Sequence, residues 1–396
     1  MESFNLCIIK PNKDAFSETF IQEHINRLPG NKRVIYGGAF PVYDHEGKLL
    51  IKSIVGVIKY LIQKRLFKKL NISVRNKALS KYLLSENIDV VFAEYGMVGA
   101  MVTAACKMAD VPLVVHFHGA DAHHKPTVDK YRSIYSQMFQ YASSIVAVSA
   151  DMVEALKKLG APADKIINAS CGVDPSAFPK LDILKTDKEF LSVGRFVEKK
   201  SPGSVIAAFK IVVDKHKDAR LTMVGAGPLF EETKQLAAKL LLNDKISFKG
   251  ILEQAQIKEL FQKTRCFVQH SVTAENGDKE GTPVTILEAG ASGLAIVSTQ
   301  HAGIKEAVLS GETGYLVSEH DIKGMADYMI KIAEDVQLAA SLGAKEAEYI
   351  RSNYDIKDRI NTLALALKQA IKDRSNVERT GTEHHKEVGL RSGKAG

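Results

Sequence analysis

Short, almost purely apolar runs alternate with helix-like runs along the chain, and this alternation constrains the fold more than any other feature. In the first half, the strand-like runs are residues 6–9, 33–36, 89–93, 113–117 and 144–148. Strands that are apolar on both faces and separated by helices are typical of a parallel sheet covered by helices on both sides.

The alternation stops at a short polar stretch, residues 179–187, and then starts again. The second set of strand-like runs is 190–194, 220–225, 246–248, 266–268 and 294–297. We therefore predict an α/β protein with two doubly wound, Rossmann-like domains facing a cleft, residues 1–178 and 188–354, with 179–187 as the linker. Ligands of such sheets bind at the carboxyl ends of the strands.

Helix signals complete this outline. Residues 19–28 are predicted to form a helix with Ser17 as its N-cap, and residues 201–216 another. Apolar residues recur every three or four positions over 355–372, which predicts a last helix with one apolar face. The polar segment 374–396 is predicted to be a disordered tail, and its His384 and His385 are assigned no function.

Composition places the chain among soluble globular proteins. It has 396 residues, of which 45% are hydrophobic and 25% charged. Its four cysteines are far apart and form no Cys-x-x-Cys pair, which favours a reducing cytosol over a zinc site or disulfide framework. The N-terminus lacks the basic start and apolar run of a signal peptide.

A formal net charge of +8 indicates an anionic partner. The sequence contains no helix-turn-helix signature and no RNA-binding aromatic motif, so nucleic acid is not expected. Much of the excess charge lies in residues 49–70, which carry too many lysines and arginines for a transmembrane helix. Two interpretations stay open: a basic helix docking on an anionic membrane surface, or a solvated face of an ordinary domain helix.

The stretch from Glu280 to Gly293 has the chemistry of a ligand site. A carboxylate, a glycine and Pro283 lead into a helix start, where free N–H groups attract oxygen-rich or anionic ligands. Glu288 follows two helical turns later. Two carboxylates that bracket a helix start suit a polyhydroxylated ligand, although by itself this spacing is common on solvated helix faces.

This Glu-x7-Glu stretch, followed by 296–299, resembles the signature of retaining nucleotide-sugar glycosyltransferases of the family 4 type, which have the GT-B fold. The resemblance covers about residues 5 to 370, with its motifs in family order: His118-Gly119, Gly172-Val173-Asp174, Gly194-Arg195 with Lys200, Gly225-x-Gly227 and Glu280-x7-Glu288. It implies transfer of a sugar from a nucleotide-sugar donor to a hydroxyl acceptor with retention of the anomeric configuration.

The resemblance also implies roles for the charged residues. Arg195 and Lys200 match the family's Gly-Arg-x4-Lys motif and would stabilise the negative charge of the departing nucleoside diphosphate. Lys199 is adjacent, but the spacing favours Lys200. Glu280 would position the transferred sugar, and Glu288 would hold the ribose hydroxyls. Because the two cations do this work, neither a divalent metal nor another cofactor is expected.

Further donor-side positions follow from the same resemblance. Gly225 and Gly227 would shape the loop near the nucleotide, and the segment with Lys249, Ile251 and Leu252 would contact the base through its backbone, so the base itself stays open. The approach to the helix would be lined by Gly281, Thr282, Pro283, Val284 and Thr285, although Pro283 has no amide hydrogen to donate.

Histidines mark the end of one first-domain strand. Alternation puts His116 and His118 on the same side of the strand, with His123 and His124 nearby, so these histidines are candidates for a metal site. No carboxylate or cysteine at a persuasive spacing completes it, and none is predicted. The resemblance places His118 near the donor sugar and the reaction centre.

The acceptor side is expected in the first domain. Glu18 and Thr19 stand where relatives carry a glycine-rich loop, and this form resembles a subgroup that assembles polysaccharides and exopolysaccharides. Glu94 and Tyr95 end another strand and are expected on the same side. The expected acceptor is a glycan or a lipid-linked sugar, met in the cytoplasm or at the inner face of the membrane.

Two other functions stay open at this point. A nucleotide-sugar epimerase on the same scaffold would isomerise the donor without any acceptor. A non-catalytic protein that binds sugar nucleotides would keep its function when Arg195 is substituted.

Overall fold

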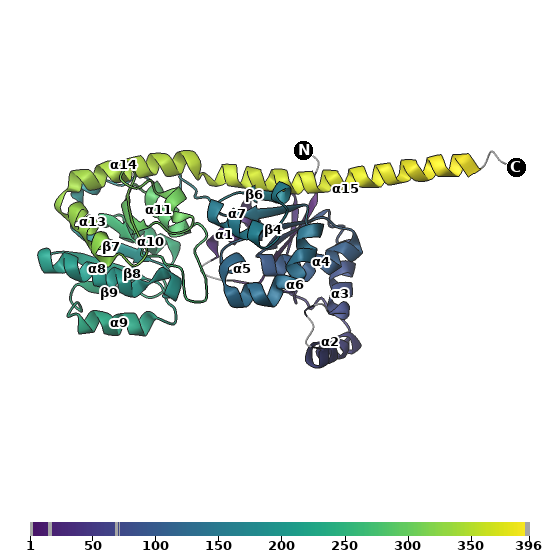
Figure 1. Cartoon of the computed structure of the whole chain (residues 1–396), viewed down its shortest axis with the longest axis horizontal. Coiled ribbons are helices and arrows are strands. Elements are labelled where there is room, and N and C mark those ends of the chain that lie inside the picture. Colours follow the sequence, from purple (N-terminus) through teal and green to yellow (C-terminus); the bar gives the residue numbers. More distant parts are fainter. Residues whose placement is uncertain (1–2, 15–17, 68–69, 71, 393–396) are drawn as a thin grey trace.

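The computed structural model describes residues 3–14, 18–67, 70 and 72–392, and it contains two α/β units that lie side by side (Figure 1). Each unit is built on a six-stranded sheet in which every neighbouring pair of strands is parallel. This confirms the predicted class of two doubly wound domains.

The first sheet has the strand order β2-β1-β3-β4-β5-β6. Its strands are β1 (Asn5–Lys10), β2 (Asn31–Tyr36), β3 (Val90–Glu94), β4 (Leu113–Phe117), β5 (Ser144–Ala147) and β6 (Ile166–Asn168). Its helices are α1 (Thr19–Arg27), α2 (Ile54–Phe67), α3 (Ser73–Ser85), α4 (Gly96–Ala109), α5 (Ala120–His123), α6 (Lys125–Tyr141) and α7 (Ala150–Lys158). The order reverses between β1 and β3, where ligands of such sheets bind.

The second sheet has the order β12-β11-β10-β7-β8-β9 and reverses between β7 and β10. Its strands are β7 (Glu189–Val193), β8 (Arg220–Val224), β9 (Ile246–Phe248), β10 (Cys266–Val268), β11 (Ala295–Thr299) and β12 (Tyr315–Val317). Its helices are α8 (Pro202–Lys215), α9 (Phe230–Lys239), α10 (Gln254–Phe261), α11 (Val284–Ala291), α12 (Ile304–Ala307), α13 (Ile322–Glu334) and α14 (Val336–Asn353).

Helix α15 (Ile356–Ser392) returns from the second unit to the first and runs along its sheet (Figure 1). Its apolar residues, among them Ile360, Leu363 and Leu367, pack with residues of β1, β3 and β4 in one core cluster. The helix continues to Ser392, beyond the end expected near residue 372 and through most of the segment expected to be disordered. This part of the chain contains no proline, so nothing in the sequence forces the helix to stop.

Most other predicted elements agree with the structure within one or two residues. Glu18 takes the N-cap position of α1 without a side-chain capping bond, whereas Ser17, the predicted cap, lies outside the described residues. The segment predicted as the linker contains a short 3₁₀ turn, Ile183–Lys185, and Ile183 is buried. Within the part of the chain that the structure describes, no helix is both long and apolar enough to cross a membrane.

Candidate functional site

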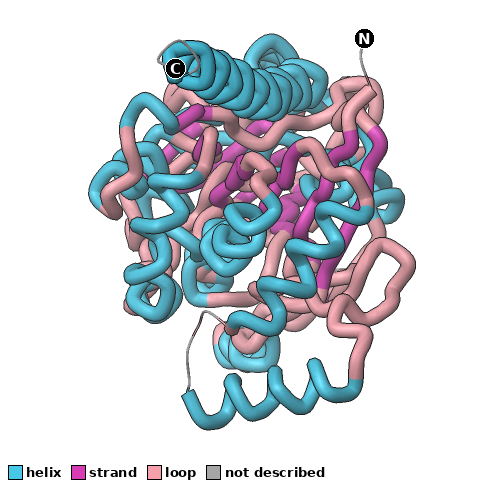
Figure 2. The backbone as a smooth tube through the Cα atoms, turned by 90° about the vertical axis from the view of Figure 1, so that its right-hand side faces the viewer, coloured by secondary structure: helices cyan, strands magenta, loops and turns pink. Residues whose placement is uncertain are grey.

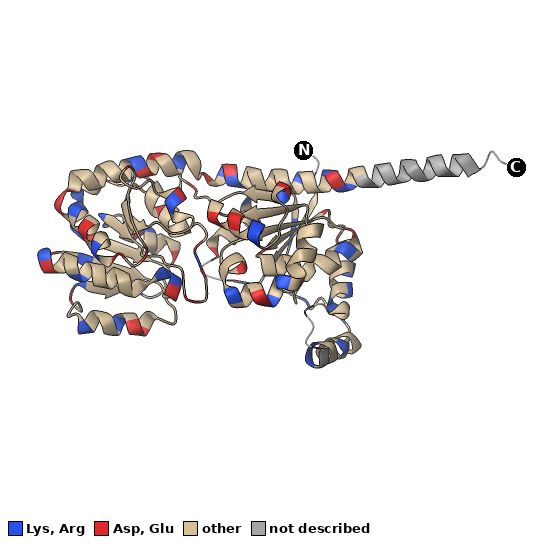
Figure 3. Cartoon of the chain, in the orientation of Figure 1, with Lys and Arg blue, Asp and Glu red and all other residues tan. Residues whose placement is uncertain are grey.

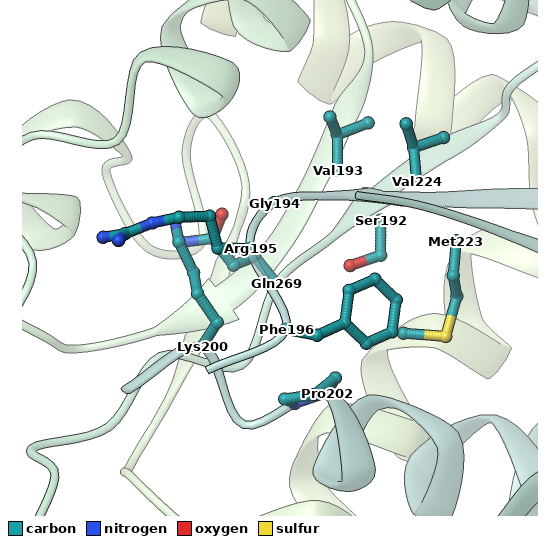
Figure 4. A pocket seen from close by; sticks show the side chains of 10 residues that line it. All are labelled: Ser192, Val193, Gly194, Arg195, Phe196, Lys200, Pro202, Met223, Val224 and Gln269. Atoms are coloured by element: carbon teal, nitrogen blue, oxygen red, sulfur yellow. The ribbon is translucent and has the colours of Figure 1, made fainter. Parts of the chain in front are cut away.

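The loop between β7 and α8 carries the two predicted cations at the switch point of the second sheet. The side chains of Arg195 and Lys200 extend to the same side of this loop, away from Phe196 and Met223 (Figure 4). Arg195 is exposed, and its guanidinium is near enough to Lys200 to lower the pKa of that lysine. An exposed guanidinium beside an ammonium group is suited to bind an anion such as a diphosphate.

Two glycines after β8 hold this loop in place. Gly225 has a φ of +132°, and a Cβ added there would lie 1.9 Å from the carbonyl oxygen of Gly194. At Gly227 the added Cβ would lie 2.4 Å from the carbonyl oxygen of Phe196. A side chain at Gly225 would therefore displace the backbone before Arg195, and one at Gly227 the backbone after it.

Lys200 reaches across to the carboxylate of Glu280, with its Nζ 3.3 Å from Oε2. Both side chains are mostly buried. Burial alone would raise the pKa of Glu280, but the ammonium groups of Lys200 and Lys199 outweigh it and lower the pKa. Burial also lowers the pKa of Lys200, and Glu280 offsets only part of that effect. The carboxylate of Glu280 is therefore held ionised beside a partly desolvated ammonium group.

Lys199 makes different contacts from Lys200. Its Nζ donates to Asp278 Oδ1 at 3.1 Å and to the carbonyl oxygen of Lys279 at 2.9 Å. These bonds fix the loop that leads into Glu280. The spacing argument that favoured Lys200 over Lys199 agrees with this geometry, because the ammonium group of Lys200 is the one that reaches Glu280.

Glu288 lies in α11, with 6% of its surface exposed. Burial raises its pKa to about 7, although the Gln254 side chain donates to its Oε1 at 3.0 Å. Gln254 begins α10, directly after the loop that carries the base-side positions. In that loop Lys249 and Ile251 are exposed and Leu252 is half-buried. These residues are thus linked to Glu288 through Gln254.

The residues expected to line the donor approach also join the two units. A Cβ at Gly281 would lie 2.6 Å from the carbonyl oxygen of His118, and the Thr282 hydroxyl donates to the carbonyl oxygen of Val148 at 2.6 Å. Pro283 is the N-cap of α11, Val284 its first residue, and Thr285 follows. The backbone beside Glu280 therefore contacts the segment that carries His118.

Glu94 is the centre of the first-unit cluster, at the end of β3. It is fully buried, and it accepts a hydrogen bond from His24 at 2.7 Å and from His118 at 2.8 Å. Burial alone would raise its pKa, but the two imidazoles outweigh it and lower the pKa. Hydrogen bonds to a carboxylate restrict imidazole rings, so Glu94 holds His118 in one orientation.

The other acceptor-side residues surround this pair. The Tyr95 hydroxyl donates to Glu18 Oε1 at 3.0 Å, and Tyr95 lies edge-on to the His118 ring at 4.9 Å. Phe20 covers another side of that ring, 4.4 Å away between centroids. Thr19 is exposed at the start of α1. Glu18 and Glu94 flank the β1/β3 switch point, so this cluster lies where the first sheet binds its ligands.

In the structure a carboxylate lies beside the histidines that were candidate metal ligands. The sequence shows no carboxylate at a persuasive spacing from His116 and His118, yet Glu94 lies beside both, because β3 and β4 pair Glu94 with His116. Among the described residues, ligand atoms of His24, Glu94 and His116 lie close enough together to share a metal ion. The contacts to His24 and His118 are of hydrogen-bond length, and the absence of a metal requirement stays a prediction.

His123 and His124, the other two histidines of the metal argument, are directed elsewhere. His123 Nε2 lies 3.4 Å from Asp151, and His124 Nδ1 bonds to Thr127.

Sequence reasoning missed two histidines that contact site residues. His24 follows Phe20 by one helical turn on α1, a spacing that puts both on one helix face and would have indicated it. His301 follows β11 and accepts a hydrogen bond from the backbone of Glu280. No spacing motif connects His301 to Glu280, because the contact arises only when the loops after β10 and β11 come together.

Two protein-family descriptions match segments of this chain. Residues 32–177 match the family described as Glycosyltransferase Family 4, and residues 173–349 match Glycosyl transferases group 1. The chain therefore belongs to the group 1, family 4 glycosyltransferases. The two matched segments meet at the junction of the two units.

Two curated relatives show the similarity in sequence. The amylovoran biosynthesis glycosyltransferase AmsK of Erwinia amylovora is 30% identical over 62% of this chain and 61% of that protein. The putative colanic acid biosynthesis glycosyltransferase WcaL of Salmonella typhimurium is 30% identical over 70% of this chain and 65% of that protein. The matched segment thus spans less than two thirds of either relative.

Solved structures show the same fold. The Anabaena protein HepE, crystallised with UDP-glucose, has a TM-score of 0.73 and 16% identity, covering 92% of this chain and 99% of that one. The sucrose-phosphate synthase of Thermosynechococcus elongatus has a TM-score of 0.73 and 15% identity, covering 93% and 100%.

Proposed function

We propose that the protein transfers a sugar from a nucleotide-diphosphate donor to a hydroxyl group of a glycan or lipid-linked acceptor, with retention of the anomeric configuration. The observation that carries the proposal is the meeting of Arg195, Lys200 and Glu280 with the segment of His118 at the junction of the two units. The relatives named for amylovoran and colanic acid biosynthesis support an acceptor in polysaccharide assembly.

In this reaction the bond between the sugar and the diphosphate oxygen breaks, and the acceptor oxygen bonds to the same carbon on the same face. The acceptor's proton leaves with the diphosphate. Arg195 and Lys200 stabilise the charge that develops on that leaving group. Glu280 positions the sugar, Glu288 holds the ribose, and His118, oriented by Glu94, supports the reaction centre. Because the two cations supply the charge, no divalent metal takes part.

The first test is a panel of nucleotide sugars, with free nucleoside diphosphate as the readout and Arg195→Ala beside the wild type. Lys263→Ala is the matched control, because it removes an exposed cation of the same unit. We expect release from one donor, lost in Arg195→Ala and kept in the control. An acceptor-free conversion of the donor into another nucleotide sugar would favour an epimerase. No release from any donor, with donor binding equal in all three proteins, would favour a binding protein.

We also propose that α2 docks the protein on an anionic membrane from the cytoplasmic side, where a lipid-linked acceptor would be met. The helix projects from the first unit and packs against α3 (Figures 1 and 2). Several of its described apolar side chains are exposed to solvent, with Ile54 80% and Val55 62% exposed. It carries exposed lysines and an arginine but no acidic residue (Figure 3). Exposed apolar and cationic groups together suit an anionic bilayer.

Liposome sedimentation tests this proposal. We expect binding to anionic vesicles that weakens with salt, and weaker binding for Lys59→Glu and for Ile58→Asp. Lys210→Glu, in the second unit, is the control for charge alone. Equal sedimentation with neutral and anionic vesicles would contradict the proposal without affecting the proposed reaction.

A further inference from the structure

His301 connects the backbone of Glu280 to a second carboxylate. The amide N–H of Glu280 donates to His301 Nε2 at 3.1 Å, and His301 Nδ1 lies 2.6 Å from Glu319 Oε1. A backbone amide can only donate, so Nε2 must be the unprotonated nitrogen. Nδ1 therefore carries the proton and donates a hydrogen bond to Glu319. The two contacts together define the tautomer of a side chain that is 1% exposed.

Glu319 is itself held in place. Its Oε2 accepts from the backbone amide of Thr273 at 2.8 Å, and its Oε1 accepts from the Thr273 hydroxyl at 3.3 Å. Burial alone would raise the pKa of Glu319, but the bonds from His301 and Thr273 outweigh it and lower the pKa. Because Glu319 is ionised and held by two hydrogen bonds from Thr273, it restricts the orientation of the His301 imidazole.

A second contact supports the same peptide from the same loop. The amide of Gly303 donates to the carbonyl oxygen of Gly281 at 3.1 Å, and a Cβ at Gly303 would lie 2.4 Å from that oxygen. The loop after β11 thus contacts the chain on both sides of the bond between Glu280 and Gly281. The direction of the Glu280 side chain is set by this backbone, while Lys200 holds only its carboxylate.

We propose that His301, anchored by Glu319, is a positioning residue that orients Glu280 toward the transferred sugar. The inference rests on the proposed function and adds two residues to it. Neither residue touches the donor; they act through the Glu280 amide. Misplacement of a substrate-positioning group by about 1 Å can lower a reaction rate about 100-fold, so a buried hydrogen bond that fixes such a group has a large effect on turnover.

Two substitutions separate the two hydrogen bonds of His301. His301→Gln keeps an acceptor oxygen where Nε2 stood and can still accept from Glu280. His301→Asn keeps a donor where Nδ1 stood and can still bond to Glu319, but it loses the Glu280 contact. His216→Gln is the matched control, because His216 also pairs with a carboxylate, Glu334, at the surface of the same unit.

The readout separates positioning from folding. We expect His301→Asn to lower kcat about 30- to 100-fold, with His301→Gln within about fivefold of wild type. Binding of the nucleoside diphosphate alone should stay within about twofold in both, because it does not depend on the sugar. Gln and Asn variants that are equally active would overturn the inference, as would an Asn variant that loses nucleoside diphosphate binding in proportion to its activity.

The tautomer gives a measurement that does not depend on activity. Spectra of ¹⁵N-histidine-labelled protein should show His301 protonated at Nδ1 and bare at Nε2, assigned by its loss in His301→Gln. Protonation at Nε2 would overturn the inference, since Nε2 could then not accept from Glu280. An inactive wild type would overturn the proposed function and this inference with it, whereas an active wild type with equal variants overturns this inference alone.

Discussion

Two regions of the molecule treat buried carboxyl groups in opposite ways: the cluster around Glu94 in the first unit, and the packed helices α11 and α14 in the second. In the first, Glu94 is surrounded by imidazoles, and their hydrogen bonds lower its pKa despite full burial. In the second, burial raises the pKa of Glu346 to about 8 and that of Glu288 to about 7. The chemistry of the neighbours, and not the depth of burial, thus decides whether a buried carboxyl is charged.

This difference gives the Glu94 cluster and the α11–α14 region opposite dependences of stability on pH. Glu94 and His116 both have lowered pKa values in the folded protein, so their contribution to stability is present above the unfolded pKa values and is lost as pH falls. Glu288 and Glu346 have raised pKa values, so their contribution to stability is fully present below about pH 4.5 and is lost as pH rises toward 7 and 8. Hydrogen exchange should show β3 and β4 less protected at low pH and α11 less protected at high pH.

The largest expected effect falls on the cation pair of the second unit. Lys200→Met keeps the length of the side chain and removes the charge that faces Glu280 and, in the proposed reaction, the departing diphosphate. We expect kcat to fall about 100- to 1000-fold, the usual cost of removing one group that stabilises transition-state charge. Lys263→Met should stay within about twofold. A Lys200→Met variant with wild-type turnover would remove Lys200 from the reaction.

The next effect probes the histidine cluster of the first unit. Glu94→Gln keeps the shape of the side chain, but its amide group turns a donor toward one of the two imidazoles. We expect the free energy of unfolding at pH 7 to fall by about 3 kcal/mol, as for other broken buried charge contacts. Glu86→Gln, which loses only the exposed bridge to Arg33, should change it by less than about 1 kcal/mol. Equal urea midpoints for the two variants would contradict the assignment of Glu94 as the centre of the cluster.

Glu346 provides the opposite case. Because its pKa is raised from 4.5 to about 8, the wild type should lose about 2.5 kcal/mol of stability between pH 5 and 7 through this residue alone. Glu346→Gln should remove that loss and be more stable than wild type at pH 7 by about 2 kcal/mol, measured by urea unfolding at both pH values. A variant whose stability follows the pH as steeply as the wild type would show that Glu346 is ionised in the fold.

The sequence predicted most of the fold and those site residues that lie within short motifs. Apolar runs between helices predicted both sheets, because parallel strands buried on both faces leave a strong local signal. Arg195 with Lys200 and Glu280 with Glu288 could be predicted as site residues because each pair lies within one short motif. Lys200 and Glu280, although far apart in sequence, lie at one switch point, as the topology requires.

What the sequence could not show depends on register between distant segments. Glu94 contacts His24 only because α1 crosses the end of β3, and Glu94 lies beside His116 only because of the register of β3 and β4. The histidines at 116 and 118 therefore suggested a metal site without its carboxylate. His301 was missed for the same reason, since its contact with Glu280 joins two loops and leaves no spacing pattern.

The smallest expected effect is that of metal removal, which tests whether protein cations or a metal ion neutralise the leaving group. If Arg195 and Lys200 neutralise the leaving group, dialysis against EDTA should change kcat by less than about twofold, whatever the pH. The first unit offers the contrasting outcome, because His24, Glu94 and His116 lie close enough to share an ion. Activity lost on dialysis, restored by zinc in the wild type and not restored in His116→Ala, would contradict metal independence. It would also show that the histidines around Glu94 hold a cation and do not simply orient His118.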